Sequence, residues 1–112
     1  NYYMNSIFSE KIIEQVYDII LKRKEFPSES SYVASLLKEG TNSILKKIGE
    51  ESTEVIIASK NENIDEQIHE ITDLLFHILV LMVNQGISLE NILEEFKKRF
   101  GQSGLKEKAS RQ

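Results

Sequence analysis

One stretch of this chain, residues 64–85, restricts its fold more than any other. The most apolar run within it, Leu74 to Val83, is interrupted only by His77. At about 100° per residue, the apolar side chains of this run cover every side of a helix, and such a helix must be buried on every side. The run has only about half of the ~20 residues that a membrane-spanning helix needs. We therefore expect it at the centre of a helical bundle.

Capping residues and apolar spacing divide the rest of the chain into helices. Side chains three and four apart repeat as apolar pairs, and no stretch alternates with period two, so we expect an all-α chain. The expected helices cover residues 6–24, 31–39, 42–60, 64–85 and 89–100. Gly40 ends the second helix, and Thr41 and Ser88 are the expected N-caps of the third and fifth.

The expected core follows from the same spacing. The inward side chains of the first, third and fourth helices are Ile12, Ile13, Val16, Tyr17, Ile20 and Leu21, then Ile44, Leu45, Ile48, Val55 and Ile56, and then Ile68, Ile71, Leu75, Ile78, Leu79 and Met82. We expect one domain over residues 1–112, in which 1–5 could be a linker remnant and 101–112 form a polar tail. Because the four other helices, two of them short, can hardly enclose the fourth, we expect a partner chain to complete the bundle.

Composition excludes several classes of function. The 112 residues carry a net charge of −4 and no cysteine. A general nucleic-acid or anionic-membrane binder is therefore not expected, and a phosphate ligand would need local cations or a metal ion. Without cysteine there is no disulfide framework, which fits a reducing compartment such as the cytoplasm.

Two pairs of acidic residues form the most informative pattern. Glu51 and Glu54 share one face of the third helix, and Glu70 and Asp73 share one face of the fourth. If these helices are antiparallel neighbours across the turn at 61–63, the four carboxylates converge and need a cation. Hard oxygen ligands in that number favour Mg²⁺, or Mn²⁺. The alternative is an ordinary solvated acidic face, but these acids lie at the margin of the apolar stripes.

Two histidines need separate interpretation. His77 follows Asp73 by one helical turn, and a hydrogen-bonded core histidine is its favoured interpretation. A di-iron bundle would need two Glu-x-x-His motifs. Only Glu66 with His69 has that spacing, and the sequence places His69 beside Glu70 rather than on the Glu70/Asp73 face. We therefore reject a di-iron site.

These residues resemble the signature of the all-α nucleoside triphosphate pyrophosphohydrolases, the MazG-like superfamily: Glu50-Glu51-x-x-Glu54, then Glu70-x-x-Asp73. Within that superfamily the chain is most similar to the phosphoribosyl-ATP pyrophosphohydrolase family of histidine biosynthesis. The segments that carry the resemblance are 31–32, 46–51, 58–61, 73–77 and 103–111. Ser43 is a departure, since the family often has lysine there.

The resemblance implies Mg²⁺-dependent hydrolysis of phosphoribosyl-ATP to phosphoribosyl-AMP and pyrophosphate by a cytoplasmic homodimer. It implies that the metal ligands are Glu51, Glu54, Glu70 and Asp73. It makes Glu50, beside Glu51, a further ligand or the base that orients water. The implied substrate contacts are Lys46, Lys47, Lys60 and Arg23 for phosphate, and Tyr32 and Asn61 for the nucleoside. In some organisms the family is fused to a phosphoribosyl-AMP cyclohydrolase, so association with that enzyme is also implied.

Two other functions stay open at this point. A house-cleaning pyrophosphohydrolase of the same superfamily would have the same acidic core and a different substrate pocket. A non-catalytic dimeric helical module would bind no Mg²⁺ and would tolerate Glu51→Gln.

Overall fold

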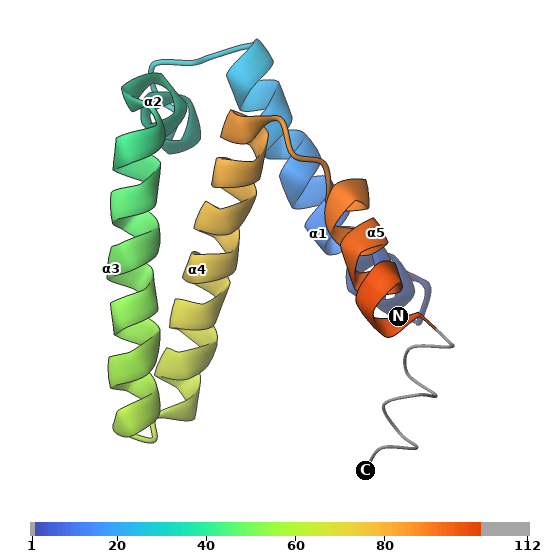
Figure 1. Cartoon of the computed structure of the whole chain (residues 1–112), viewed down its shortest axis with the longest axis vertical. Coiled ribbons are helices and arrows are strands. Elements are labelled where there is room, and N and C mark those ends of the chain that lie inside the picture. Colours follow the sequence, from blue (N-terminus) through green and yellow to red (C-terminus); the bar gives the residue numbers. More distant parts are fainter. Residues whose placement is uncertain (1, 102–112) are drawn as a thin grey trace.

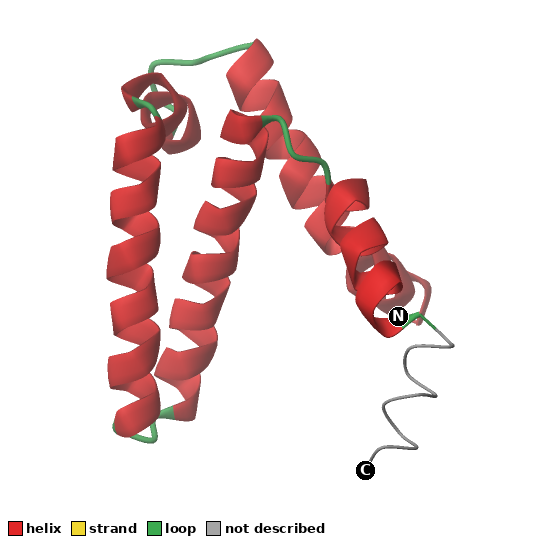
Figure 2. Cartoon of the chain, viewed as in Figure 1, coloured by secondary structure: helices red, strands yellow, loops and turns green. Residues whose placement is uncertain are grey.

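The computed structural model describes residues 2–101, with side chains described from Lys11 onward. These residues form five helices and no strand, which confirms the predicted all-α class (Figures 1 and 2). The helices are α1 (Tyr2–Glu25), α2 (Tyr32–Glu39), α3 (Thr41–Lys60), α4 (Ile64–Gln85) and α5 (Leu89–Phe100). The expected start of α1 at Ser6 was wrong by four residues, because no proline or glycine precedes Ser6 to stop the helix. Of the expected polar tail at 101–112, residues 102–112 lie outside the described residues.

Helices α3 and α4 form an antiparallel hairpin that carries both acidic pairs (Figure 1). The predicted turn at 61–63 is confirmed: Asn63 N–H donates to the Ala58 carbonyl and Glu62 N–H to the Ser59 carbonyl. Glu62 has a φ of 57°, the left-handed conformation that this helix ending requires. The Asn63 side chain then caps α4 by accepting from the Glu66 N–H at 3.1 Å. This tight turn fixes which turns of the two helices lie opposite each other.

The caps at the ends of α4 and α5 agree with the sequence prediction, whereas the cap at the start of α3 does not. Ser88 caps α5 in a reciprocal capping box with Asn91, and Gly86 ends α4 with a φ of 71°. Thr41, however, is the first residue of α3, and Gly40 is its N-cap with a φ of 101°. The Thr41 hydroxyl instead donates to the Asn84 amide oxygen at 3.1 Å, which ties the start of α3 to the end of α4.

The core lies at the end of the hairpin where α2 and the C-terminal half of α1 pack. Its fully buried side chains are Ile20, Ile44, Val80 and Val83, with Leu36, Leu79 and Met82 around them. The predicted burial of Ile20, Ile44, Leu79 and Met82 is thus confirmed.

Much of the remaining expected core is exposed in the single chain. Ile68 is 60% exposed, and several other predicted core positions are also exposed: Ile12, Ile13, Leu45, Ile56, Ile71 and Leu75. These predictions were wrong for the isolated chain, because no described helix covers the far half of the hairpin. α5 contributes no buried residue.

No single helix within residues 2–101 has the length and apolar character needed to cross a bilayer; only α4 and α5 combined, across a bend of 107°, meet that measure.

Candidate active site

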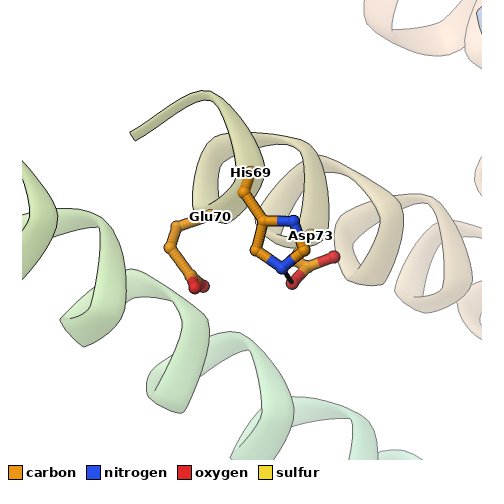
Figure 3. Close-up of side chains that lie close together, drawn as sticks. All are labelled: His69, Glu70 and Asp73. Atoms are coloured by element: carbon orange, nitrogen blue, oxygen red, sulfur yellow. Dashed lines mark ion pairs between the residues drawn. The ribbon is translucent and has the colours of Figure 1, made fainter. Parts of the chain in front are cut away.

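Carboxylates from α3 and α4 meet in the middle of the hairpin. The Glu51 carboxyl on α3 lies within hydrogen-bonding reach of the Glu70 carboxyl on α4. One turn further along α4, Asp73 joins this group. Ligand atoms of His69, Glu70 and Asp73 all lie within 4.8 Å of one another, and Figure 3 shows the three side chains gathered on one side of α4. Glu54 follows Glu51 by one turn of α3 and is exposed.

The position of His69 differs from the sequence interpretation. His69 Nε2 lies 3.3 Å from the Asp73 carboxylate (Figure 3), so the histidine is on the same side as Asp73. The spacing of four residues between them was the signal that could have shown this. The prediction that His69 lies off the Glu70/Asp73 face was therefore wrong. The chain still has only one Glu-x-x-His pair, and a di-iron site needs two.

The crowding of acidic groups changes the acidity of Glu70. Desolvation raises the pKa of the Glu70 carboxyl above its ordinary 4.5, and the hydrogen bond and negative charge of Glu51 raise that pKa further. Nearby His69 opposes this shift, while Asp73 adds to it. In the metal-free chain, the protonated form of Glu70 is therefore favoured more than usual, and a cation at this point would relieve its repulsion by Glu51.

We expect Glu70→Gln to stabilise the metal-free fold at neutral and higher pH. Between pH 4.5 and the raised pKa, the folded chain holds a proton on Glu70 that the unfolded chain releases. The free energy of unfolding of the wild type therefore falls as pH rises through that range. Removing the charge should flatten this fall, and the Tm of the variant should exceed that of the wild type above this pH range. Thermal unfolding in EDTA across pH tests this, and parallel pH profiles for the two proteins would contradict it.

A second polar group lies one turn beyond the carboxylates. His77 is buried, and its Nδ1 lies 2.9 Å from the Asp73 carbonyl oxygen while its Nε2 lies 2.9 Å from the Tyr32 hydroxyl. The interpretation of His77 as a hydrogen-bonded core histidine is confirmed. Desolvation raises the pKa of the Tyr32 phenol, Lys47 lowers it and Glu51 raises it, so Tyr32 from α2 lies close to the acidic group.

The predicted cationic contacts fall in three places. Lys47 is half-buried near Tyr32 and pairs with Glu50 at 3.9 Å. Lys46 is exposed beside it. Lys60 and Asn61 lie at the opposite end of α3, where the Asn61 N–H donates to the Ile57 carbonyl.

Arg23 lies elsewhere. It lines an open cavity of about 710 Å³ between the end of α1 and α2, together with Lys24, Lys38 and Ser35. The residues that line this cavity include neither Tyr32 nor Glu51, Glu70 or Asp73. The structure therefore does not bring Arg23 to the carboxylates within this chain.

The donor set fits a hard divalent cation. Carboxylate oxygens from two helices converge closely enough for Glu51 and Glu70 to share a hydrogen bond. Such oxygens are the ligands that Mg²⁺ and Mn²⁺ prefer. The adjacent imidazole of His69 is also compatible with Mn²⁺.

The fold and the acidic group together define the class. An all-α chain with converging carboxylates on two antiparallel helices belongs with the all-α nucleoside triphosphate pyrophosphohydrolases. Within that class, the model of one family, phosphoribosyl-ATP pyrophosphohydrolase, matches residues 13–100. The chain belongs to the phosphoribosyl-ATP pyrophosphohydrolase family.

Individual relatives agree with this assignment. The phosphoribosyl-ATP pyrophosphatase of Geotalea daltonii is 50% identical over 103 residues, which cover 92% of this chain and 97% of the relative. The protein of the same name from Pelobacter propionicus is 49% identical over 89% of this chain and 93% of its own length. The one from Leptospira biflexa is 58% identical over 73% of this chain and 89% of its own length.

Proposed function

We propose that this chain is an enzyme that hydrolyses phosphoribosyl-ATP to phosphoribosyl-AMP and pyrophosphate, a step of histidine biosynthesis. Membership of the family and the names of the relatives support the substrate and the reaction. In the structure of this chain, the observation that supports the proposal is the convergence of Glu51, Glu70 and Asp73 across the hairpin.

A divalent cation, Mg²⁺ or Mn²⁺, is part of the proposal. We expect Glu51, Glu54, Glu70 and Asp73 to hold it. When bound, such an ion neutralises charge on a polyphosphate and makes a coordinated water more acidic. Without it, the carboxylates would repel the substrate, so the metal would be a condition of binding as well as of chemistry.

The other side chains have separate expected roles. Lys47 lies close to both Glu50 and Tyr32, so it can attract a phosphate to the Tyr32 end of the acidic group, with exposed Lys46 beside it. Glu50 is exposed, and we expect it to serve as a further ligand or to orient the attacking water. Tyr32 would contact the nucleoside side. The remaining predicted contacts lie apart from the carboxylates: Lys60 and Asn61 at the far end of α3, and Arg23 in the cavity between α1 and α2. Each would contact a different part of the substrate.

A second copy of the chain is the proposed occupant of the exposed apolar faces. Ile64, Ile68, Ile71 and Leu75 repeat every three or four residues along α4 and are 43–64% exposed. α5 presents a further apolar face, with Leu93 and Phe96 more than half exposed. Faces of this kind are typical of association surfaces. A homodimer would bury the α4 stripe and turn the splayed helices of Figure 1 into a closed bundle.

The cellular compartment and a partner enzyme are also part of the proposal. A histidine-pathway enzyme without cysteine fits the cytoplasm. Its product, phosphoribosyl-AMP, is the substrate of a cyclohydrolase, so association or fusion with that enzyme would pass the product on directly.

A substrate panel tests the proposed reaction. The purified chain with Mg²⁺ is offered phosphoribosyl-ATP, ATP, dATP, dUTP and dCTP separately, and pyrophosphate release is measured. We expect kcat/KM for phosphoribosyl-ATP to exceed that for each of the other nucleotides by at least about 10³-fold. A site that hydrogen-bonds polar groups of its substrate strongly rejects analogues that lack those groups. Preference for a deoxynucleotide would instead indicate nucleotide pool cleaning. Silence on every substrate from a folded protein would favour a non-catalytic helical module.

A further inference from the structure

His77 joins α2 to the turn of α4 that carries Asp73. Its ring is buried, and the rings of Tyr32 and Phe76 meet it edge-on, with centroids 5.9 and 5.4 Å away. Both ring nitrogens have hydrogen-bond partners, the Asp73 carbonyl oxygen and the Tyr32 hydroxyl. The imidazole is therefore held in one position and one orientation.

The partner of Nδ1 fixes the position of the ring proton. A carbonyl oxygen can only accept, so the nitrogen 2.9 Å from the Asp73 carbonyl must carry the hydrogen. In a neutral imidazole the other nitrogen, Nε2, is then an acceptor. The Tyr32 hydroxyl must donate its only proton to Nε2.

This donation determines what Tyr32 offers to a ligand. Once its proton points to His77, the phenolic oxygen has only lone pairs left, so it can accept a hydrogen bond and cannot donate one. Tyr32 is 51% exposed, and the charges of Lys47 and Glu51 act on its phenol, so the oxygen lies at the edge of the acidic group. A phosphate oxygen, itself an acceptor, is a poor partner at this position.

We propose that His77 is a positioning residue that makes Tyr32 a hydrogen-bond acceptor for a donor group of the substrate, a ribose hydroxyl or the adenine amino group. This inference rests on the proposed function for its substrate. His77 acts through Tyr32 and contacts no reacting atom. Tyr32 selects the sugar or base side of the substrate, while the lysines and the metal bind its phosphates.

Four variants test whether His77 acts through Tyr32, by steady-state kinetics with phosphoribosyl-ATP and saturating Mg²⁺. Tyr32→Phe removes the acceptor and should raise KM about 3- to 10-fold with kcat within about twofold, the effect of one hydrogen bond. His77→Phe should raise KM similarly. The double variant should be no worse than Tyr32→Phe alone, because His77 acts through the missing hydroxyl. His77→Gln, whose amide oxygen can accept from Tyr32, should stay within about twofold of wild type.

Tyr17→Phe is the matched control, since it removes another tyrosine hydroxyl. That hydroxyl donates to the Ile87 carbonyl at 2.8 Å, beyond the end of α4 and away from the carboxylates. It should leave KM unchanged. KM increases that multiply in the double variant, or a wild-type KM in His77→Phe, would overturn the proposal. If His77→Phe does not fold, His77→Leu, which also lacks an acceptor for the Tyr32 hydroxyl, takes its place with the same expected rise in KM.

A second readout is independent of turnover. Long-range ¹H–¹⁵N NMR of the imidazoles identifies the tautomer, and His69→Asn assigns the two histidines of the chain. We expect His77 to carry its proton on Nδ1 in the wild type. A proton on Nε2 would overturn the proposal whether or not the enzyme is active. A wild type that does not hydrolyse phosphoribosyl-ATP, with the Nδ1 tautomer present, would instead overturn the proposed substrate.

Discussion

Glu51→Gln should lower kcat for phosphoribosyl-ATP by about 10³-fold or more. Glu51 is the residue of α3 that reaches the carboxylates of α4, through its hydrogen bond with Glu70. A neutral amide keeps the shape of the side chain but removes a negative ligand, and a bound metal supplies several kcal/mol of charge stabilisation. Asp73→Asn should have an effect of similar size.

The control for this prediction is Glu94→Gln on α5. Glu94 pairs with Lys97 at 3.5 Å on an exposed helix surface, so its loss removes the same charge away from the hairpin. Mn²⁺ binding, followed by electron paramagnetic resonance, should weaken in Glu51→Gln and stay unchanged in Glu94→Gln. Retention of kcat within tenfold by Glu51→Gln would show that the carboxylates are an ordinary acidic face.

Ile68→Glu should convert the proposed homodimer into single chains at micromolar concentration. Ile68 is 60% exposed in the single chain, at the middle of the α4 apolar stripe, so a charge there costs the monomer little. In a dimer, the same carboxylate would be buried without a partner, at a cost of several kcal/mol, which weakens association by more than about 10³-fold. Sedimentation analysis gives the oligomeric state.

Gln15→Glu is the matched control for the dimer prediction. Gln15 is exposed on α1, and this substitution adds the same single charge to a polar position. It should leave the dimer intact. A wild type that sediments as a single chain, or an Ile68→Glu variant that remains dimeric, would contradict the proposed partner surface.

Local features of this fold could be predicted from the sequence. The turn at 61–63, the caps at Asn63 and Ser88 and the end of α4 at Gly86 each depend on a few neighbouring residues. Thr41 misled the prediction because its hydroxyl has a better partner across the hairpin, Asn84, than at its own helix end. The acidic faces were also predictable, since helical spacing alone puts Glu70 and Asp73 on one side of α4.

Contacts between separate helices were harder to predict. The bond between Tyr32 and His77 spans 45 residues and depends on the packing of α2 against α4, which no local pattern specifies. Arg23 was grouped with the phosphate contacts, yet it lines a cavity between α1 and α2 whose lining includes none of the hairpin carboxylates. Ile68 and Leu75 were predicted to be buried, and they are exposed because no described helix of this chain packs over that stripe.

We expect this chain to release pyrophosphate from phosphoribosyl-ATP at a metal held by the hairpin carboxylates. The most direct measurement is pyrophosphate release by the wild type before chelation, after dialysis against EDTA, and after Mg²⁺ is restored. Activity that disappears with the metal and returns with it, with phosphoribosyl-AMP as the second product, is the predicted result. Undiminished release in EDTA, or no release with Mg²⁺ from a folded protein, would contradict this expectation.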